Sequence, residues 1–128
     1  MVSVKIFEKE YPIAYTVAAQ SKIADRFGGI EKIEQAFGAG DIAALMENMA
    51  FCASVMMGAY EDREAVRSEA VGNIYARSIT LTPEQVSAAI LPSEVKALSQ
   101  AIMDAMKEGN KISMEVVPSK SKNGEATQ

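Results

Sequence analysis

The sequence contains no histidine and no tryptophan, and Cys52 is its only cysteine. The lack of histidine excludes the Ser-His-Asp and Cys-His arrangements that activate a nucleophile, and it excludes zinc sites built from cysteine and histidine. A single cysteine cannot form an internal disulfide, which is typical of an intracellular protein. We therefore expect neither an enzyme of these classes nor a zinc protein.

Positive charge and long hydrophobic runs are also scarce. The 13 Lys and Arg residues against 17 Asp and Glu residues give a formal net charge of -4, the wrong sign for binding the phosphate backbone of a nucleic acid. The longest uncharged stretch, residues 48–60, is shorter than the roughly 18 residues of a membrane span. Charges at Lys5 and Glu8 interrupt the N-terminus before a signal peptide could form. These features predict a soluble cytoplasmic protein with no nucleic-acid or membrane partner.

The N-terminal residues carry the pattern of a β-hairpin. Apolar and polar residues alternate over residues 2–6, and an apolar, aromatic-rich run follows at residues 11–15. The charged residues 8–10 separate the two runs, so we expect the turn of the hairpin at these residues. Pro12 cannot donate a ladder hydrogen bond, which places it on an edge or at the start of the second strand.

Helix start and stop signals divide most of the remaining chain. Thr16 is a predicted N-cap, and Gly28 is expected to end that helix. Thr82, Pro83 and Gln85 form a second start signal, for a helix that ends near Ile90 ahead of a proline. The further helices are expected at residues 30–37, from Asp41 onward, and from a Ser93 N-cap to Gly109. A helical pattern also returns at residues 65–75.

The helix that follows Asp41 has the most regular apolar pattern. Its main stripe, at spacings of three and four, consists of Ile42, Leu45, Met46, Met49, Cys52, Ala53, Met56 and Tyr60. Phe51, Val55 and Met57 lie off this stripe and widen the apolar arc. Such a helix is either central in the fold or paired on two sides. Whether it continues through residues 61–75 or a second helix begins at residue 65 is left open by the pattern.

The predicted fold is therefore α+β and mainly α-helical, with an N-terminal β-hairpin followed by a bundle of about five helices. Its length of 128 residues, 48% of them hydrophobic, suits one globular domain, which we place at residues 1–117. The alternation of Ile112, Met114 and Val116 is compatible with a short C-terminal strand. Residues 118–128 lack a large apolar side chain, and we expect a disordered tail.

No pattern points to a catalytic, cofactor or metal site, and we expect a protein that is not an enzyme and has no cofactor. The carboxylates around residues 61–69 match no calcium loop, and the charges at residues 61–67 are predicted to form a solvated helix face. The glycine pairs are explained as helix ends, because no Gly-Lys-Ser/Thr follows them. Cys52 is predicted to be a small core residue.

The eight methionines leave two interpretations open. Flexible thioethers fill irregular cores, and they also make adaptable surfaces for partner proteins. Core filling is the default interpretation, and the wide apolar arc of the long helix keeps a partner surface open as the second. The candidate contacts of that surface are Phe51, Val55, Met56 and Met57. The same arc predicts a homo-oligomer of undetermined copy number.

The order of these features resembles the tail assembly chaperones of long-tailed bacteriophages and prophages over about residues 2–108. The residues that carry the resemblance are Val4-Lys5-Ile6, Tyr11-Pro12-Ile13, the helix end Arg26-Phe27-Gly28-Gly29, the long central helix, and Leu81-Thr82-Pro83-Glu84-Gln85-Val86. The resemblance implies a non-enzymatic protein of the bacterial host cytoplasm that binds the tape-measure protein and recruits tail-tube subunits. The alternative is a structural phage component, such as a head-tail connector or tail-completion protein, that stays in the virion.

Overall fold

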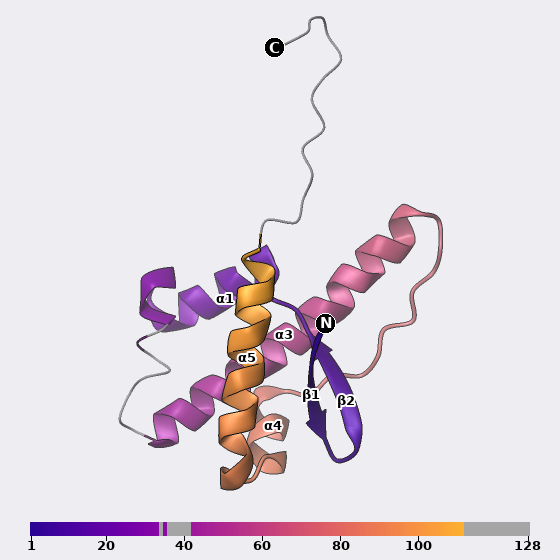
Figure 1. The fold of residues 1–128 in the computed structure, drawn as a ribbon. Helices are drawn as coiled ribbons and strands as arrows, with labels where there is room; N and C mark the ends of the chain where they lie inside the picture. Colours follow the sequence, from indigo (N-terminus) through magenta and orange to yellow (C-terminus); the bar gives the residue numbers. More distant parts are fainter. Residues whose placement is uncertain (34, 36–41, 112–128) are drawn as a thin grey trace, which may run out of the picture.

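The computed structural model describes residues 1–33, 35 and 42–111, and it is an N-terminal hairpin packed against helices (Figure 1). The elements are β1 (Val2–Ile6), β2 (Lys9–Ile13), α1 (Val17–Phe27), the 3-10 turn η1 (Ile30–Lys32), α3 (Ile42–Ala70), α4 (Pro83–Ala89), the 3-10 turn η2 (Pro92–Glu94) and α5 (Val95–Gly109). The predicted α+β, mainly helical fold is confirmed. Of the helix expected at residues 30–37, the described residues form the 3-10 turn η1 at its start, and residues 34, 36 and 37 lie outside the described residues. Asp41, the strand expected at residues 112–117 and the tail also lie outside them.

The hairpin turns one to two residues earlier than the sequence predicts. The strands pair antiparallel from Val2 opposite Ile13 to Ile6 opposite Lys9, so that the turn consists of Phe7 and Glu8. Both turn residues have positive φ, 50° and 67°, as a two-residue turn between twisted strands requires. The charged residues 9 and 10 therefore belong to β2 rather than to the turn. Among the described residues β2 pairs with β1 alone, so Pro12 lies on an edge strand, as predicted.

The predicted caps of α1 and α4 are confirmed. The Thr16 hydroxyl accepts a hydrogen bond from the Ala19 amide at 3.1 Å, and Gly28 ends α1 in the left-handed conformation. At α4, Thr82 Oγ1 accepts from the Gln85 amide at 3.1 Å, and Gln85 Oε1 accepts from the Thr82 amide at 2.9 Å. Each pair satisfies backbone amides that the first helical turn leaves without intrahelical partners.

Two of the predicted helix boundaries are wrong. Ser93 does not cap α5, because η2 runs directly into it and the Glu94 carboxylate accepts from the Leu91 amide at 2.8 Å. Of the two alternatives left open for residues 61–75, the structure has the continuous helix, but α3 ends at Ala70 rather than at Tyr75.

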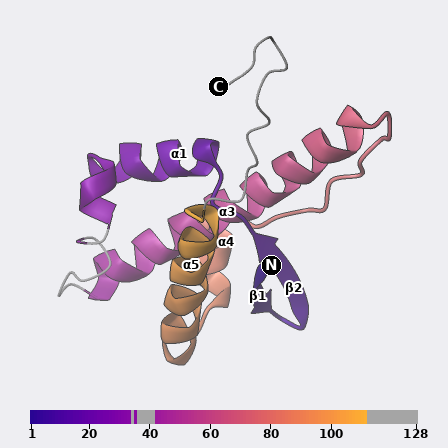
Figure 2. The same cartoon turned by 45° about the horizontal axis from the view of Figure 1, so that its top comes forward.

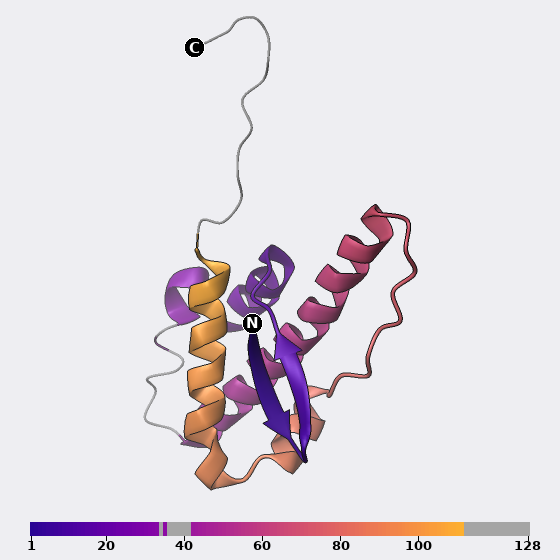
Figure 3. The same ribbon diagram turned by 45° about the vertical axis from the view of Figure 1, so that its right-hand side comes forward.

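The N-terminal half of α3 is central, which is one of the two arrangements that its wide apolar arc predicts. It packs against β2, α1, α4 and α5. The hairpin and α5 lie side by side over α3 (Figures 1 and 3), and the Ala14 amide after β2 donates to the Met56 carbonyl at 3.1 Å. Because neighbours surround the helix, residues on and off the main stripe are both buried. The fully buried side chains of α3 include Met49, Cys52, Met56 and Met57.

The C-terminal end of α3 is closed by a glycine motif. The Asn73 amide donates to the Ser68 carbonyl at 2.9 Å and the Gly72 amide to the Glu69 carbonyl at 3.1 Å, with Gly72 at φ +84°. This double hydrogen bond satisfies carbonyls that the helix end leaves unpaired, and it requires a left-handed residue. The chain reverses direction at this point.

Replacing Met57 with alanine should lower the free energy of unfolding by about 2–5 kcal/mol, because its side chain has no exposed surface and truncation leaves a cavity. Met103→Ala is the matched control. That methionine is 40% exposed on α5, so its truncation should cost less than about 1 kcal/mol. Urea denaturation measures both values. Equal costs for the two variants would contradict the placement of Met57 in the core.

Two glycine-to-alanine changes within and after α3 should have opposite effects. Gly58 lies inside the helix with open space at its Cβ position, so Gly58→Ala should stabilise the protein by about 0.5–1 kcal/mol. Gly72→Ala also meets no neighbouring atom, but its left-handed backbone should cost about 1–2 kcal/mol. Urea denaturation of both variants tests this. A stabilised Gly72→Ala would show that α3 does not end in the glycine motif.

Candidate functional site

The four predicted partner contacts do not form an exposed surface. Met56 and Met57 are completely buried, and Val55 is half-buried against the core. At Met56 and Met57 the structure agrees with the interpretation of the methionines as core residues and not with that of a partner surface. The position of Met57 off the main stripe is covered because α3 has neighbours on several sides rather than on one. In the folded protein, neither methionine side chain is accessible to a partner.

Phe51 is the predicted contact that borders an open groove. Its ring is half-buried and lies under the Arg26 guanidinium, whose carbon is 4.6 Å from the ring centroid. The groove, of about 680 Å³, lies between α1, α3 and α4 and is lined by Arg26, Glu47, Phe51, Pro83, Glu84 and Ser87. The face of the Phe51 ring is therefore already in contact with Arg26 of the same chain, and a cation over an aromatic face is a favourable contact.

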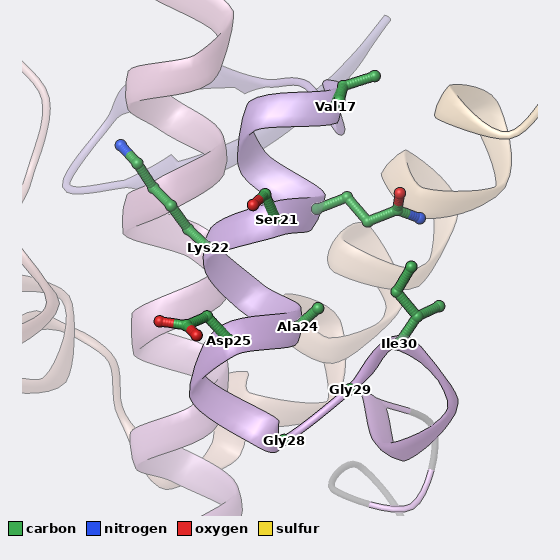
Figure 4. Close-up of a pocket in the computed structure, with 9 residues that line it drawn as sticks. Val17, Ser21, Lys22, Ala24, Asp25, Gly28, Gly29 and Ile30 are labelled. Atoms are coloured by element: carbon green, nitrogen blue, oxygen red, sulfur yellow. The ribbon is translucent and has the colours of Figure 1, made fainter.

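A second hollow, of about 570 Å³, follows the surface of α1 and η1 (Figure 4). The side chains of Lys22 and Asp25 point to one side of α1, whereas Ile30 lies on the other. The polar groups of this hollow therefore do not converge on a common point. Convergent polar groups are what distinguishes a small-molecule site from a shallow surface, so this hollow is not the candidate site.

The described residues present little chemistry for catalysis. They contain no group of three metal-ligating side chains. Cys52 is fully buried, as predicted, and burial raises the pKa of its thiol to about 12, so it is neutral and inaccessible at pH 7. No helix among these residues is long and apolar enough to cross a membrane.

The most distinctive surface is a projecting arm, which we define as residues 61–80. It consists of the C-terminal part of α3 and the return segment, residues 71–80, which runs back along the helix toward α4 (Figures 1 and 2). In all three views the arm extends away from the other elements. The sequence does not predict this arrangement, because residues 65–75 have a helical apolar pattern.

Distances along α3 show that the return segment is stretched. It is attached near Ser68 at one end, and at the other the Leu81 carbonyl accepts from Ser54 Oγ at 2.7 Å. The helix between Ser54 and Ser68 rises about 21 Å at 1.5 Å per residue. The steps from Asn73 to Leu81 reach at most about 26–29 Å. The return segment is therefore largely extended.

A buried carboxylate holds the middle of the return segment. Glu61 is 6% exposed, and its Oε1 accepts from the Tyr75 hydroxyl at 2.9 Å and from the Ser78 amide at 2.7 Å. Asp62 adds an ion pair with Arg77. The predicted solvated charge face is therefore wrong at Glu61. The helix face on which it lies is covered by an extended chain that sequence periodicity does not reveal.

The arm exposes large apolar side chains. Ile74 is 98% exposed and Ile79 is 82% exposed, and Val66 and Val71 are also largely in solvent. These four belong to the ten exposed large hydrophobic residues of the described chain. Gly72 and Asn73, a helix-end signal, and the β-branched residues after them could have indicated an extended segment here. These four exposed apolar side chains make the arm the candidate surface for binding another protein.

Comparisons with protein-family models, curated proteins and solved structures find no match for this chain.

Replacing Glu61 with glutamine should loosen the return segment and lower the pKa of Tyr75. The hydrogen bond to the Glu61 carboxylate raises the pKa of Tyr75 above its ordinary value of about 10. Because the pKa is higher in the folded chain, this bond stabilises the fold below about pH 10, and the stabilisation is lost as the pH rises through the raised pKa.

Ultraviolet titration of the tyrosines and hydrogen exchange at the Ser78 amide measure these effects. Glu64→Gln is the matched control for the exchange measurement, because Glu64 pairs with Arg67 on its own helix at 3.2 Å. In the titration it should lower the pKa of Tyr75 less than Glu61→Gln does, because the charge of Glu64 is the smallest cause of the raised pKa. Unchanged exchange at Ser78 in Glu61→Gln would contradict the role of Glu61 as the anchor.

Proposed function

We propose that this protein is a tail assembly chaperone of a long-tailed bacteriophage or prophage, and that the arm is its client-binding surface. The observation that carries the proposal is the exposure of Ile74 and Ile79 on a segment that Glu61 and Asp62 hold in place. A chaperone of apolar helices needs such side chains in solvent. The resemblance in the order of sequence features supplies the client, the tape-measure protein.

The charge of the chain supports the same role. A formal net charge of -4 favours solubility while apolar side chains are displayed. On the arm, Asp62, Arg67 and Arg77 are partly exposed beside the apolar side chains. A surface of this composition suits an amphipathic helix, whose apolar face contacts the isoleucines and whose polar flanks meet the charges. Recruitment of tail-tube subunits is the second activity that the resemblance implies.

The proposal is tested by co-expression with the tape-measure protein, which we expect to be encoded by a very long, helix-rich open reading frame immediately downstream. Ile74→Glu and Ile79→Glu should each reduce co-purification at least tenfold, because a carboxylate would have to be desolvated in the complex. Circular dichroism should be unchanged, since both side chains are largely in solvent.

Ile30→Glu is the matched control, because Ile30 is an exposed isoleucine on η1 away from the arm, and it should co-purify as the unchanged protein does. Normal co-purification of both arm variants would exclude the arm as the client site. Mass spectrometry of purified mature particles tests the role itself. Detection of this protein in the particles at stoichiometric amounts would contradict the role of a chaperone. It would indicate the alternative, a structural component that stays in the virion.

A further inference from the structure

Two peptide bonds of this chain join an arginine to a serine, Arg67–Ser68 and Arg77–Ser78. The first lies inside α3, where helical hydrogen bonds hold the backbone. The second lies in the return segment, which is largely extended. Of the backbone groups of residues 74–80, the Ser78 amide is the one with a hydrogen-bond partner within the described chain. The same pair of residues is therefore present once in helical and once in extended backbone.

The extended copy of the pair has the conformation that a protease binds. A serine protease holds its substrate as an extended strand, because backbone groups of the substrate pair with those of the enzyme. Residues 76–79 are all exposed, and exposed connecting segments are the positions where folded proteins are cut. A helix must first open locally before it fits the same active site. The return segment therefore presents Arg77–Ser78 to an enzyme that cleaves after arginine, whereas α3 protects Arg67–Ser68.

Two adjacent carboxylates of α3 hold the two sides of the exposed bond. Asp62 forms an ion pair with the Arg77 guanidinium, and Glu61 Oε1 accepts a hydrogen bond from the Ser78 amide at 2.7 Å. A protease that selects arginine binds the guanidinium with a carboxylate of its own, so Arg77 must first separate from Asp62. The Ser78 nitrogen is the leaving group of the cleavage and must separate from Glu61. Cleavage therefore requires both contacts to open.

We propose that the Arg77–Ser78 bond is a site of limited proteolysis for serine proteases that cleave after arginine, and that Glu61 and Asp62 control its opening. The protease serine attacks the Arg77 carbonyl carbon, and the Ser78 nitrogen leaves as an amine with a proton from the protease histidine. Water then releases the Arg77 carboxylate, so each cut consumes one water molecule. The inference does not rest on the proposed function, because no client takes part in the cleavage.

The two pieces should remain together after the cut. The C-terminal piece contains α4 and α5, whose buried Val86 and Ile102 belong to the same core as Ile23 and Met56 of the N-terminal piece. The cut separates Ile74 from Ile79, so it divides the apolar surface of the arm and leaves the core intact. Size-exclusion chromatography of the cut protein should show both pieces in one peak. Their separation without denaturant would contradict a cut confined to the arm.

The first test is limited digestion of the full chain with trypsin, with the fragments identified by mass spectrometry. Short peptides that contain each of the two bonds give the ratio of cleavage rates that the local sequence sets. In the folded protein, the ratio of the rate at Arg77–Ser78 to that at Arg67–Ser68 should exceed this value at least tenfold, because the bond in α3 is protected by the helix. An Arg77–Ser78 bond that stays uncut, or a ratio equal to that of the peptides, would overturn the proposal.

The second test measures the control of opening. Glu61→Gln should raise the rate of cleavage at Arg77–Ser78 at least threefold and Asp62→Asn about twofold, because cleavage follows the population of the open segment. The Asp62 side chain is 65% exposed, so the Asp62→Asn variant should fold even if Glu61→Gln does not. Glu64→Gln is the matched control and should leave the rate unchanged, since Glu64 pairs with Arg67 on its own helix. Unchanged rates in both latch variants, Glu61→Gln and Asp62→Asn, would overturn the role of these carboxylates.

Discussion

The breadth of the apolar surface on the N-terminal half of α3 is the constraint on which the rest of the structure depends. One layer of neighbouring elements is enough to bury a helix that has a single apolar stripe. Met57 lies off the stripe that contains Met49 and Met56, yet all three side chains are fully buried. This burial requires neighbours on several sides, which the hairpin, α1, α4 and α5 provide. The flexible methionine side chains can fill the irregular spaces between such different elements.

Beyond this core, α3 continues as the arm, where burial by neighbouring elements gives way to polar contacts. The buried carboxylate of Glu61 accepts two hydrogen bonds from the return segment in place of hydrogen bonds from water. Asp62 forms an ion pair with Arg77. A carboxylate that is buried and hydrogen-bonded by two donors is costly to leave unpaired, so these contacts favour one position of the segment. The same contacts hold Ile74 and Ile79 in solvent, where no other part of the described chain covers them.

This division of α3 is the reason why we propose a binding surface on the arm. The potential nucleophile Cys52 lies in the buried half with a raised pKa, and the hollow on α1 lacks converging polar groups. The accessible and unusual groups are apolar side chains and unpaired backbone on the arm. The proposed function uses the exposed apolar side chains of the arm to bind a client helix.

Local signals in the sequence determined the ends of several elements, whereas only the tertiary structure decided which surfaces remain exposed. Thr16, Gly28, Thr82 and Gln85 act on backbone groups within a few residues, so their roles follow from sequence alone. The exposure of Met57 and of Glu61 depends on segments that pack against them from elsewhere in the chain. An apolar arc has the same periodicity whether the protein's own helices or a partner covers it, and a run of charges looks solvated until an extended segment lies across it. Periodicity describes one element, and burial is a property of contacts between elements.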